Sequence, residues 1–325
     1  MLDNTSYTFF IFLAVLLIME KQEEKKIKRI SVYRIEGPAD FPAGDQHPGE
    51  ALLHRTTDFH PEWARPIAET QYDSKGNIEQ VVEYAYDGHG FLIREFLKES
   101  DGEVVEERSF EPDEQQRLKK EFRHYADGSF DVTEFFYDEN GRVVKKILSD
   151  DEGEVERVEE FEYQDDKPLL EKAVDGEGNL LLEVGYLYDD KGLLEEVHAE
   201  NPEEGGSYQK VHAYTPEGNR KSTLVYDPEG ELVERYLFEV DEKGHPATVV
   251  EETKTKKNTI RMEYDAQGHV VLQEEHDLNG ELVNRVERRY DQQGNLLESR
   301  VVFRNPRLGL LQEYSVFQQY DFFNE

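Results

Sequence analysis

The sequence contains no cysteine. It therefore has no disulfide bond, no thiolate nucleophile and no cysteine-ligated zinc. Hydrophobic residues are also scarce, at 37% of the 325 residues, whereas charged residues reach 34%. A compact globular domain carries nearer half apolar residues and about a quarter charged ones. Because 18 Tyr and 18 Phe are still spread along the chain, the shortage predicts an ordered but thin structure with little core.

Basic residues are few beside acidic ones. The chain has 38 Lys and Arg against 73 Asp and Glu, which leaves a net charge of −35. A nucleic-acid-binding protein needs a basic surface to displace counterions from phosphate, so DNA and RNA are excluded as ligands. Anionic membrane surfaces are disfavoured for the same reason. The charge favours a basic protein partner, and solubility alone is the alternative explanation.

Long hydrophobic runs are absent as well. The apolar segment 9–19 is shorter than the roughly 20 residues that span a bilayer as a helix. It resembles the apolar part of a signal peptide, yet no Lys or Arg precedes it and no small-residue cleavage site follows. Translation from Met19 would exclude it altogether. The basic cluster at 25–29 favours a cytoplasmic repeat region, with export or membrane anchoring through residues 9–19 as the alternative.

A short turn motif recurs between residues 72 and 295. It reads Tyr-Asp-x-x-Gly-x-Leu or Val, and its glycines form two interleaved series, each with a period of about 26 residues. The aspartate side chain accepts bonds from backbone N–H groups, and the glycine supplies the positive φ that closes a hairpin. The clearest copies begin at Tyr72, Tyr86, Tyr137, Tyr188, Tyr226, Tyr264 and Tyr290.

The segments between these turns alternate with the period of a strand. After Gly280, Leu282 and Val286 point one way and Val283 the other. The sequence therefore predicts an all-β fold, a long antiparallel meander of hairpins with about 26 residues per two-strand unit. Charge on both faces of most strands argues against burial between layers, and strand twist coils a long sheet. We expect a single twisted or spiral sheet, shaped as a curved strip.

Four segments follow along the chain. Residues 1–19 form an apolar N-terminal segment, 20–70 an N-terminal cap region, 71–302 the hairpin repeats and 303–325 a C-terminal cap strand. Repeat arrays need terminal caps, because their outermost strands otherwise expose unpaired backbone groups. The two segments outside the repeats suit that task.

The repeated turns resemble those of the Rhs/YD-repeat proteins. The family repeat reads roughly Tyr-Asp-x-x-Gly-Arg-Leu, and the segment YDENGRV, from Tyr137 to Val143, comes close to it. The resemblance covers residues 72–296. Large family members look like hollow β-shells around a C-terminal toxin, but this chain has few repeats and no distinct toxin domain after residue 300. The resemblance therefore implies the twisted hairpin sheet, and it also suggests bacterial immunity or antitoxin-like proteins, in which similar short repeats occur.

The segment from Phe41 to Arg65 has an unusual composition, with three histidines and the only tryptophan. Aromatic and arginine side chains are favoured anchors of protein interfaces. A cap loop whose tryptophan covers the first strand is the alternative explanation, and a metal site formed by His47 and its neighbours is another. The residues predicted to bind a partner are His54, Arg55, His60, Trp63 and Arg65.

No catalytic motif stands out in the sequence. It contains no Ser-His-Asp order, phosphate loop, HExxH or dinucleotide fingerprint, and one aspartate per turn does not supply the six to eight oxygens of a calcium site. We expect no cofactor and no metal. The repeats predict a non-enzymatic protein-binding or scaffold module. The alternatives are an immunity-like protein that neutralises a basic toxin or effector, and a hydrolase using carboxylates or the histidine-rich segment.

Overall fold

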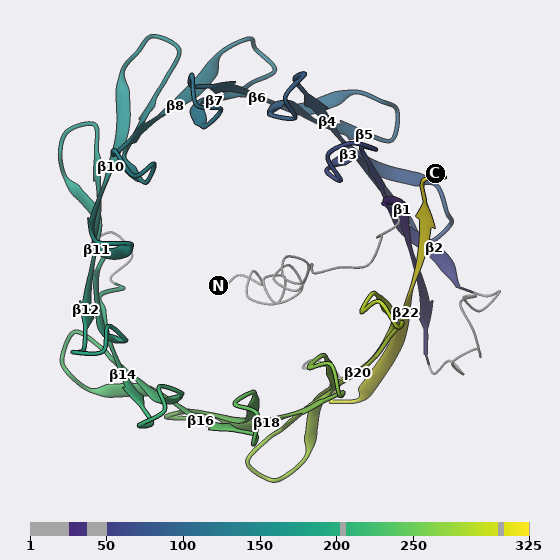
Figure 1. Cartoon of the computed structure of the whole chain (residues 1–325), viewed down its shortest axis with the longest axis vertical. Helices are drawn as coiled ribbons and strands as arrows, with labels where there is room; N and C mark the ends of the chain where they lie inside the picture. Colours follow the sequence, from purple (N-terminus) through teal and green to yellow (C-terminus); the bar gives the residue numbers. More distant parts are fainter. Residues whose placement is uncertain (1–25, 38–50, 202–205, 305–308, 325) are drawn as a thin grey trace.

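The computed structural model describes residues 26–37, 51–201, 206–304 and 309–324. Within these ranges every regular element is a β-strand, and the strands follow one another around a ring (Figure 1). The strands are β1 (Ile27–Glu36), β2 (Leu52–Phe59), β3 (Pro66–Tyr72), β4 (Ile78–Tyr86), β5 (Leu92–Glu99), β6 (Val104–Pro112), β7 (Leu118–His124), β8 (Phe130–Tyr137), β9 (Val143–Ser149), β10 (Val155–Gln164), β11 (Lys167–Asp175), β12 (Leu180–Tyr188), β13 (Leu194–Glu200), β14 (Tyr208–Tyr214), β15 (Arg220–Tyr226), β16 (Leu232–Val240), β17 (Pro246–Thr253), β18 (Lys257–Tyr264), β19 (Val270–His276), β20 (Leu282–Tyr290), β21 (Leu296–Arg304) and β22 (Leu311–Phe322).

The repeated turns are hairpin corners, as the motif predicts. In the turn after β8, the amide of Asp138 donates to the carbonyl of Arg142 at 2.9 Å, and the amide of Gly141 donates to the carbonyl of Asp138 at 3.0 Å. The Asp138 carboxylate accepts the amides of Asn140 and Arg142, both at 2.9 Å. Gly141 has a φ of 81°, a conformation that glycine adopts without strain. The predicted chemistry of aspartate and glycine is therefore confirmed.

Each strand pairs antiparallel with the next one, and β1 pairs with β22. The seam is long: it runs from Ile27 opposite Phe322 to Glu36 opposite Tyr314. This closure corrects the expectation of an open or spiral strip. Segments outside the repeats supply β1, β2 and β22, and pairing of β1 with β22 removes both free edges of the sheet. With a spacing of about 4.8 Å between strands, 22 strands give a perimeter of roughly 105 Å before tilt.

The wall of the ring is one sheet thick and has two faces. The register places Val184, Ala199 and Tyr208 on one face, called here the Val184 face. Followed strand by strand around the ring, Glu298 and its partner Phe317 fall on the opposite face, called the Glu298 face. The buried apolar residues are few: Val32, Ala173, Val184, Val197, Ala199, Val225 and Phe317.

Candidate functional site

Alternate turns of an antiparallel meander lie at opposite ends of the strands, so the ring has two rims. Rim 1 holds the described turns at 73–77, 99–103, 125–129, 150–154, 175–179, 227–231, 253–256 and 277–281. Rim 2 holds those at 60–65, 87–91, 113–117, 138–142, 165–166, 189–193, 215–219, 241–245, 265–269 and 291–295. The two rims differ in the contacts and the exposure of the apolar residue that begins the strand after each turn.

In rim 2, a tyrosine near the end of a strand ties its own turn to the preceding one. Tyr137 donates its hydroxyl to the carbonyl of Leu118, the first residue of the neighbouring strand, at 2.6 Å. Leu118 is half-buried there, and burial raises the pKa of Tyr137. Corresponding bonds join Tyr86 to Pro66, Tyr163 to Val143, Tyr188 to Pro168, Tyr214 to Leu194, Tyr264 to Pro246, Tyr290 to Val270 and Tyr320 to Leu296.

Cationic and imidazole side chains add a second contact between rim-2 turns. Arg117 forms an ion pair with Asp113 at 2.6 Å, and its guanidinium lies 4.3 Å from the centre of the Tyr137 ring. His269 occupies the same place in the next-to-last turn of the series, with its ring 4.6 Å from that of Tyr290. A cation over an aromatic ring contributes about 0.5–1 kcal/mol at an exposed site. Rim 2 therefore carries a ladder of contacts, interrupted where Pro112 and Val240 take the place of the tyrosine.

The structure divides the five residues predicted to bind a partner into two groups. His60 stacks on Trp63 with their centres 3.9 Å apart, and Trp63 meets the edge of Tyr86 at 5.9 Å. Arg65 donates a hydrogen bond to the Gly90 carbonyl. These three predicted residues form the first step of the rim-2 ladder. The other two, His54 and Arg55, lie on β2 and do not join this contact.

In the described part of rim 1 no tyrosine makes such a bond, and one arginine does: Arg304 donates to the carbonyl of Leu282 at 3.2 Å. Several large apolar side chains beside this rim are 38% to 67% exposed, namely Ile78, Val104, Val155, Leu232 and Leu278. The sequence explains part of this difference, because the residue before several rim-1 turns is not tyrosine: it is Lys98, Ser149 or Val174. The residue that precedes the turn therefore distinguishes the two turn series, a difference that is not visible when all copies of the motif are read as one pattern.

Four consecutive rim-1 turns form a surface that we call the acidic arc. The arc comprises the turns 99–103, 125–129, 150–154 and 175–179, and none of them contains a Lys or Arg. Exposed apolar side chains stand beside the carboxylates, at Val104, Val105, Tyr125 and Val155. The acidic residues of these turns are Glu99, Asp101, Glu103, Asp127, Asp150, Asp151, Glu152, Glu154, Asp175 and Glu177.

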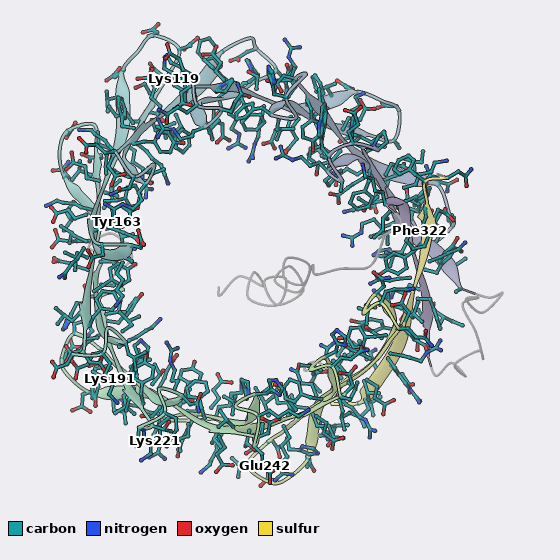
Figure 2. The ribbon with its side chains drawn as sticks, viewed as in Figure 1. Lys119, Tyr163, Lys191, Lys221, Glu242 and Phe322 are labelled. Atoms are coloured by element: carbon teal, nitrogen blue, oxygen red, sulfur yellow. The ribbon has the colours of Figure 1, made fainter. Side chains whose placement is uncertain are left out.

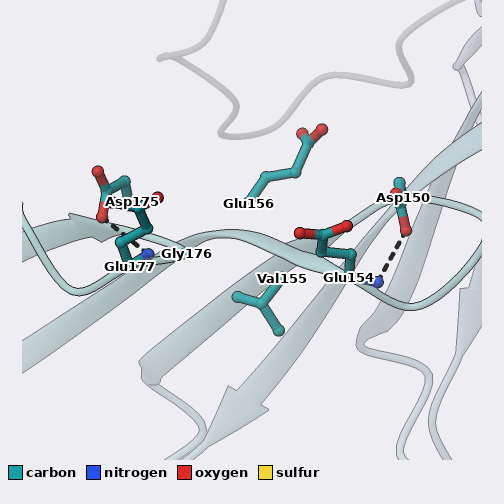
Figure 3. Close-up of a pocket in the computed structure, with 7 residues that line it drawn as sticks. All are labelled: Asp150, Glu154, Val155, Glu156, Asp175, Gly176 and Glu177. Carbon is teal, nitrogen blue, oxygen red and sulfur yellow. Dashed lines mark hydrogen bonds between the residues drawn. The ribbon is translucent and has the colours of Figure 1, made fainter.

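A shallow hollow of about 570 Å³ lies within the arc, between two neighbouring turns (Figure 3). Asp150 and Asp175 use their carboxylates to hold their own turns, accepting the amides of Glu154 at 2.8 Å and Glu177 at 3.0 Å. The side chains of Glu154, Glu156 and Glu177 form no ion pair with a basic group in the described part of the chain. The hollow is thus lined by two carboxylates that hold their own turns and by three that make no ion pair in the described chain.

Charges on the wall, in contrast, are largely paired across strands. On the Val184 face the Lys146 ammonium lies 3.0 Å from Glu159, and on the Glu298 face Lys145 lies 3.0 Å from Glu160. Each such exposed pair contributes about 0.2–1 kcal/mol. The uncompensated negative charge is therefore concentrated at turns such as those of the arc.

One carboxylate of the wall is shielded from solvent. Glu298 is 1% exposed, and burial raises its pKa although Arg289 donates to it at 2.9 Å. Ser315, which is 0% exposed, lies on the neighbouring strand of the same face. Neither residue lines the hollow of the acidic arc. In the described ranges no group of three or more His, Cys, Asp or Glu side chains is arranged to hold a metal ion, and His47 lies outside them.

No family model matches the chain, and no curated protein matches its sequence. Solved structures give matches at low similarity. A porin-like protein from Bacteroides uniformis is 11% identical, with 92% of this chain and 98% of that one covered and a TM-score of 0.33. A porin-like protein from Bacteroides vulgatus is 8% identical, with 92% and 99% covered and a TM-score of 0.21. The TcdB2-TccC3 structure without its hypervariable C-terminal region is 12% identical, with a TM-score of 0.20, and 82% of this chain matches 20% of it.

The closed ring also corrects the expected location. Closed antiparallel barrels with an even number of strands are an architecture of outer-membrane proteins, and this chain closes with 22 strands. This architecture contradicts the prediction of a cytoplasmic protein. The described residues include no helix with the length and hydrophobicity needed to cross a bilayer.

Proposed function

We propose that the protein is a non-enzymatic binding protein whose ring recognises another protein. The supporting observation is how little of the fold is buried. Only seven apolar residues of the described chain are buried, so most side chains of the one-layer wall lie at a surface. Extended surfaces of this kind are what repeat proteins use to bind partners.

The size of the ring suits a folded partner. A perimeter of roughly 105 Å corresponds to a diameter of at least about 34 Å, and a domain of 100 residues is about as wide, since its radius of gyration is about 13 Å. Side chains stand on both sides of the wall, and those of the described residues do not fill the centre of the ring (Figure 2). A rim of these dimensions offers a footprint for a whole domain.

Affinity capture from extract and medium of the producing cells tests the proposal. The folded protein is immobilised beside an unrelated protein of similar net charge, and eluates at low and high salt are compared by mass spectrometry. A protein retained by the ring and absent from the charge-matched control is the expected result. Retention of the same set of proteins by both would contradict the proposal.

A basic partner, such as a toxin or effector that the ring neutralises, is the second candidate. The net charge of −35 and its concentration at the turns favour it. Association between opposite charges is screened by salt, so the dissociation constant should rise steeply between 50 mM and 500 mM salt. Binding that does not respond to salt would discard this candidate and leave the first one standing.

We also infer that the ring is exported into an aqueous compartment. A membrane-spanning barrel presents an apolar band about 25 Å tall to lipid. Here both faces of the wall carry ion pairs, as at Lys146 with Glu159 and at Lys145 with Glu160. Fractionation of the producing cells tests this: recovery in the soluble exported fraction without detergent is expected, and recovery only with detergent would contradict it.

A further inference from the structure

We propose that the acidic arc is the docking surface of the ring, and that its partner presents a segment rich in both basic and apolar side chains. The inference rests on the proposed protein-binding function and specifies where and how the binding occurs. It follows from three properties of the arc: its exposed apolar residues, its uncompensated charge and its difference from rim 2.

Four apolar side chains of the arc are more than a third exposed. Val104 and Val105 are 45% and 49% exposed, Tyr125 is 41% exposed and Val155 is 38% exposed. At rim 2 the residues at the start of the strand, for example Leu118 and Val143, are half-buried, and a tyrosine hydroxyl bonds their carbonyls. No described tyrosine makes such a bond in the arc, where Val104 and Val155 are exposed although Phe130 and Leu180 are half-buried. Exposed apolar groups rimmed by polar ones mark interaction surfaces.

The negative charge of the arc favours a partner segment that carries basic side chains. The nearest basic side chains are already engaged: Arg123 lies 3.7 Å from Glu106, and the Arg157 guanidinium lies 2.9 Å from Glu159. A second copy of this chain would bring carboxylates against carboxylates, which is unfavourable. A segment that alternates or mixes Lys or Arg with Leu, Ile or Phe would satisfy both features, because its cations meet the carboxylates while its apolar groups cover the valines.

The dimensions of the arc define the length of that segment. Successive rim-1 turns are two strands apart, so the four turns extend over roughly 29 Å at about 4.8 Å per strand. An extended peptide of about nine residues, or a helix of about nineteen, has this length. The backbone of the arc is closely built, because a Cβ on Gly176 would lie 1.9 Å from the carbonyl oxygen of Val155. The docking surface is consequently short, and its backbone is tightly packed at Gly176.

A defined peptide probe tests the proposal. The probe is a fluorescently labelled 20-residue peptide of Lys and Leu, and a second peptide replaces every Leu with Ser at the same charge. Binding to the full chain is followed by fluorescence anisotropy at fixed salt. We expect the Lys–Leu peptide to bind at least about tenfold more tightly than the Lys–Ser peptide, because only the former covers the apolar residues. Equal affinity of the two peptides, or no binding of either, would overturn the proposal.

Matched variants locate the site. The arc variant carries Glu154→Gln, Glu156→Gln and Glu177→Gln. The control variant carries the same change of charge at exposed positions of rim 2 and consists of Glu114→Gln, Glu139→Gln and Glu242→Gln. We expect the arc variant to weaken binding of the Lys–Leu peptide about tenfold and the control variant less than threefold, since three exposed ion pairs are lost only in the first. Equal weakening would show a diffuse attraction to net charge and would refute the assignment.

A further variant, Val104→Ser with Val155→Ser, tests the contribution of the apolar residues. Leu187→Ser is the control, because Leu187 is 53% exposed and lies away from the arc. The affinity for the Lys–Leu peptide should fall in the Val104 and Val155 variant only. Light scattering excludes the other occupant: a dimer that the arc variant dissociates would overturn the proposal. If a captured cellular partner binds wild type and arc variant equally, the protein-binding function stands and the arc assignment fails. If nothing is captured specifically, the proposed function itself fails.

Discussion

Removal of one hydroxyl from rim 2 tests the difference between the two rims. Tyr188 donates its hydroxyl to the carbonyl of Pro168 at 2.9 Å, and burial raises the pKa of this tyrosine. In Tyr188→Phe the ring remains beside the Lys167 ammonium, which lies 5.2 Å from its centre. The variant therefore removes one hydrogen bond and little else.

The magnitude follows from that bond. A neutral hydrogen bond contributes about 0.5–1.5 kcal/mol net, and Pro168 is only partly exposed, so we expect a loss of about 1 kcal/mol. Tyr226→Phe is the matched control, because Tyr226 begins the same motif on rim 1, is similarly buried and has no hydroxyl bond among the described residues. That variant should change the free energy of unfolding by less than about 0.5 kcal/mol.

Urea unfolding monitored by circular dichroism measures both variants. Tyr188→Phe should lower the midpoint without changing the slope m, since neither variant alters the surface exposed on unfolding. If the two variants lose equal stability, or if Tyr226→Phe loses more, the ladder of rim 2 is not what distinguishes the rims.

Three further outcomes are expected. Asp87, Asp113 and Asp138 have lowered pKa values, chiefly because a backbone amide of the turn bonds each carboxylate, so their contribution is lost as pH falls below about 4 and urea midpoints should drop there. Burial raises the pKa of Tyr188, so the contribution of its hydroxyl is lost as pH rises above about 10, and Tyr188→Phe should unfold less steeply with alkali than wild type. Gly176→Ala should lower the melting temperature, because its Cβ would overlap the Val155 carbonyl, whereas Gly230→Ala meets no neighbour and tests the strain of positive φ alone. Unchanged midpoints at low pH, parallel alkaline curves, or a harmless Gly176→Ala would each count against the corresponding contact.

The local structure could be predicted from the sequence because it depends on short-range chemistry. The turn prediction held even where the glycine was missing, since Gln116 has a φ of 63° in its slot. The repeat of turns and strands gave the antiparallel meander. Composition marked the Trp63 segment as unusual, and the structure stacks His60 on Trp63 and bonds Arg65 to the Gly90 carbonyl.

Closure could not be predicted in the same way. It depends on twist accumulated over all 22 strands and on pairing of β1 with β22, two segments that lie outside the motif and far apart in the chain. The exposed apolar residues of rim 1 were missed because every turn was treated as equivalent. Comparing the two series would have shown that tyrosine precedes the turn mostly in rim 2, whereas Lys98 or Ser149 takes its place in rim 1.

A disulfide across the seam tests the closed ring most directly. Ser31 and Gln319 are Cα partners across β1 and β22, and the chain has no cysteine of its own. In the folded monomer, Ser31→Cys with Gln319→Cys should oxidise to a single intramolecular disulfide, identified by mass spectrometry of the digest. The pair Ser31→Cys with Ser222→Cys, which lies on β15, should not. Failure of the first pair to bond, with the protein folded, would show that the chain is an open strip.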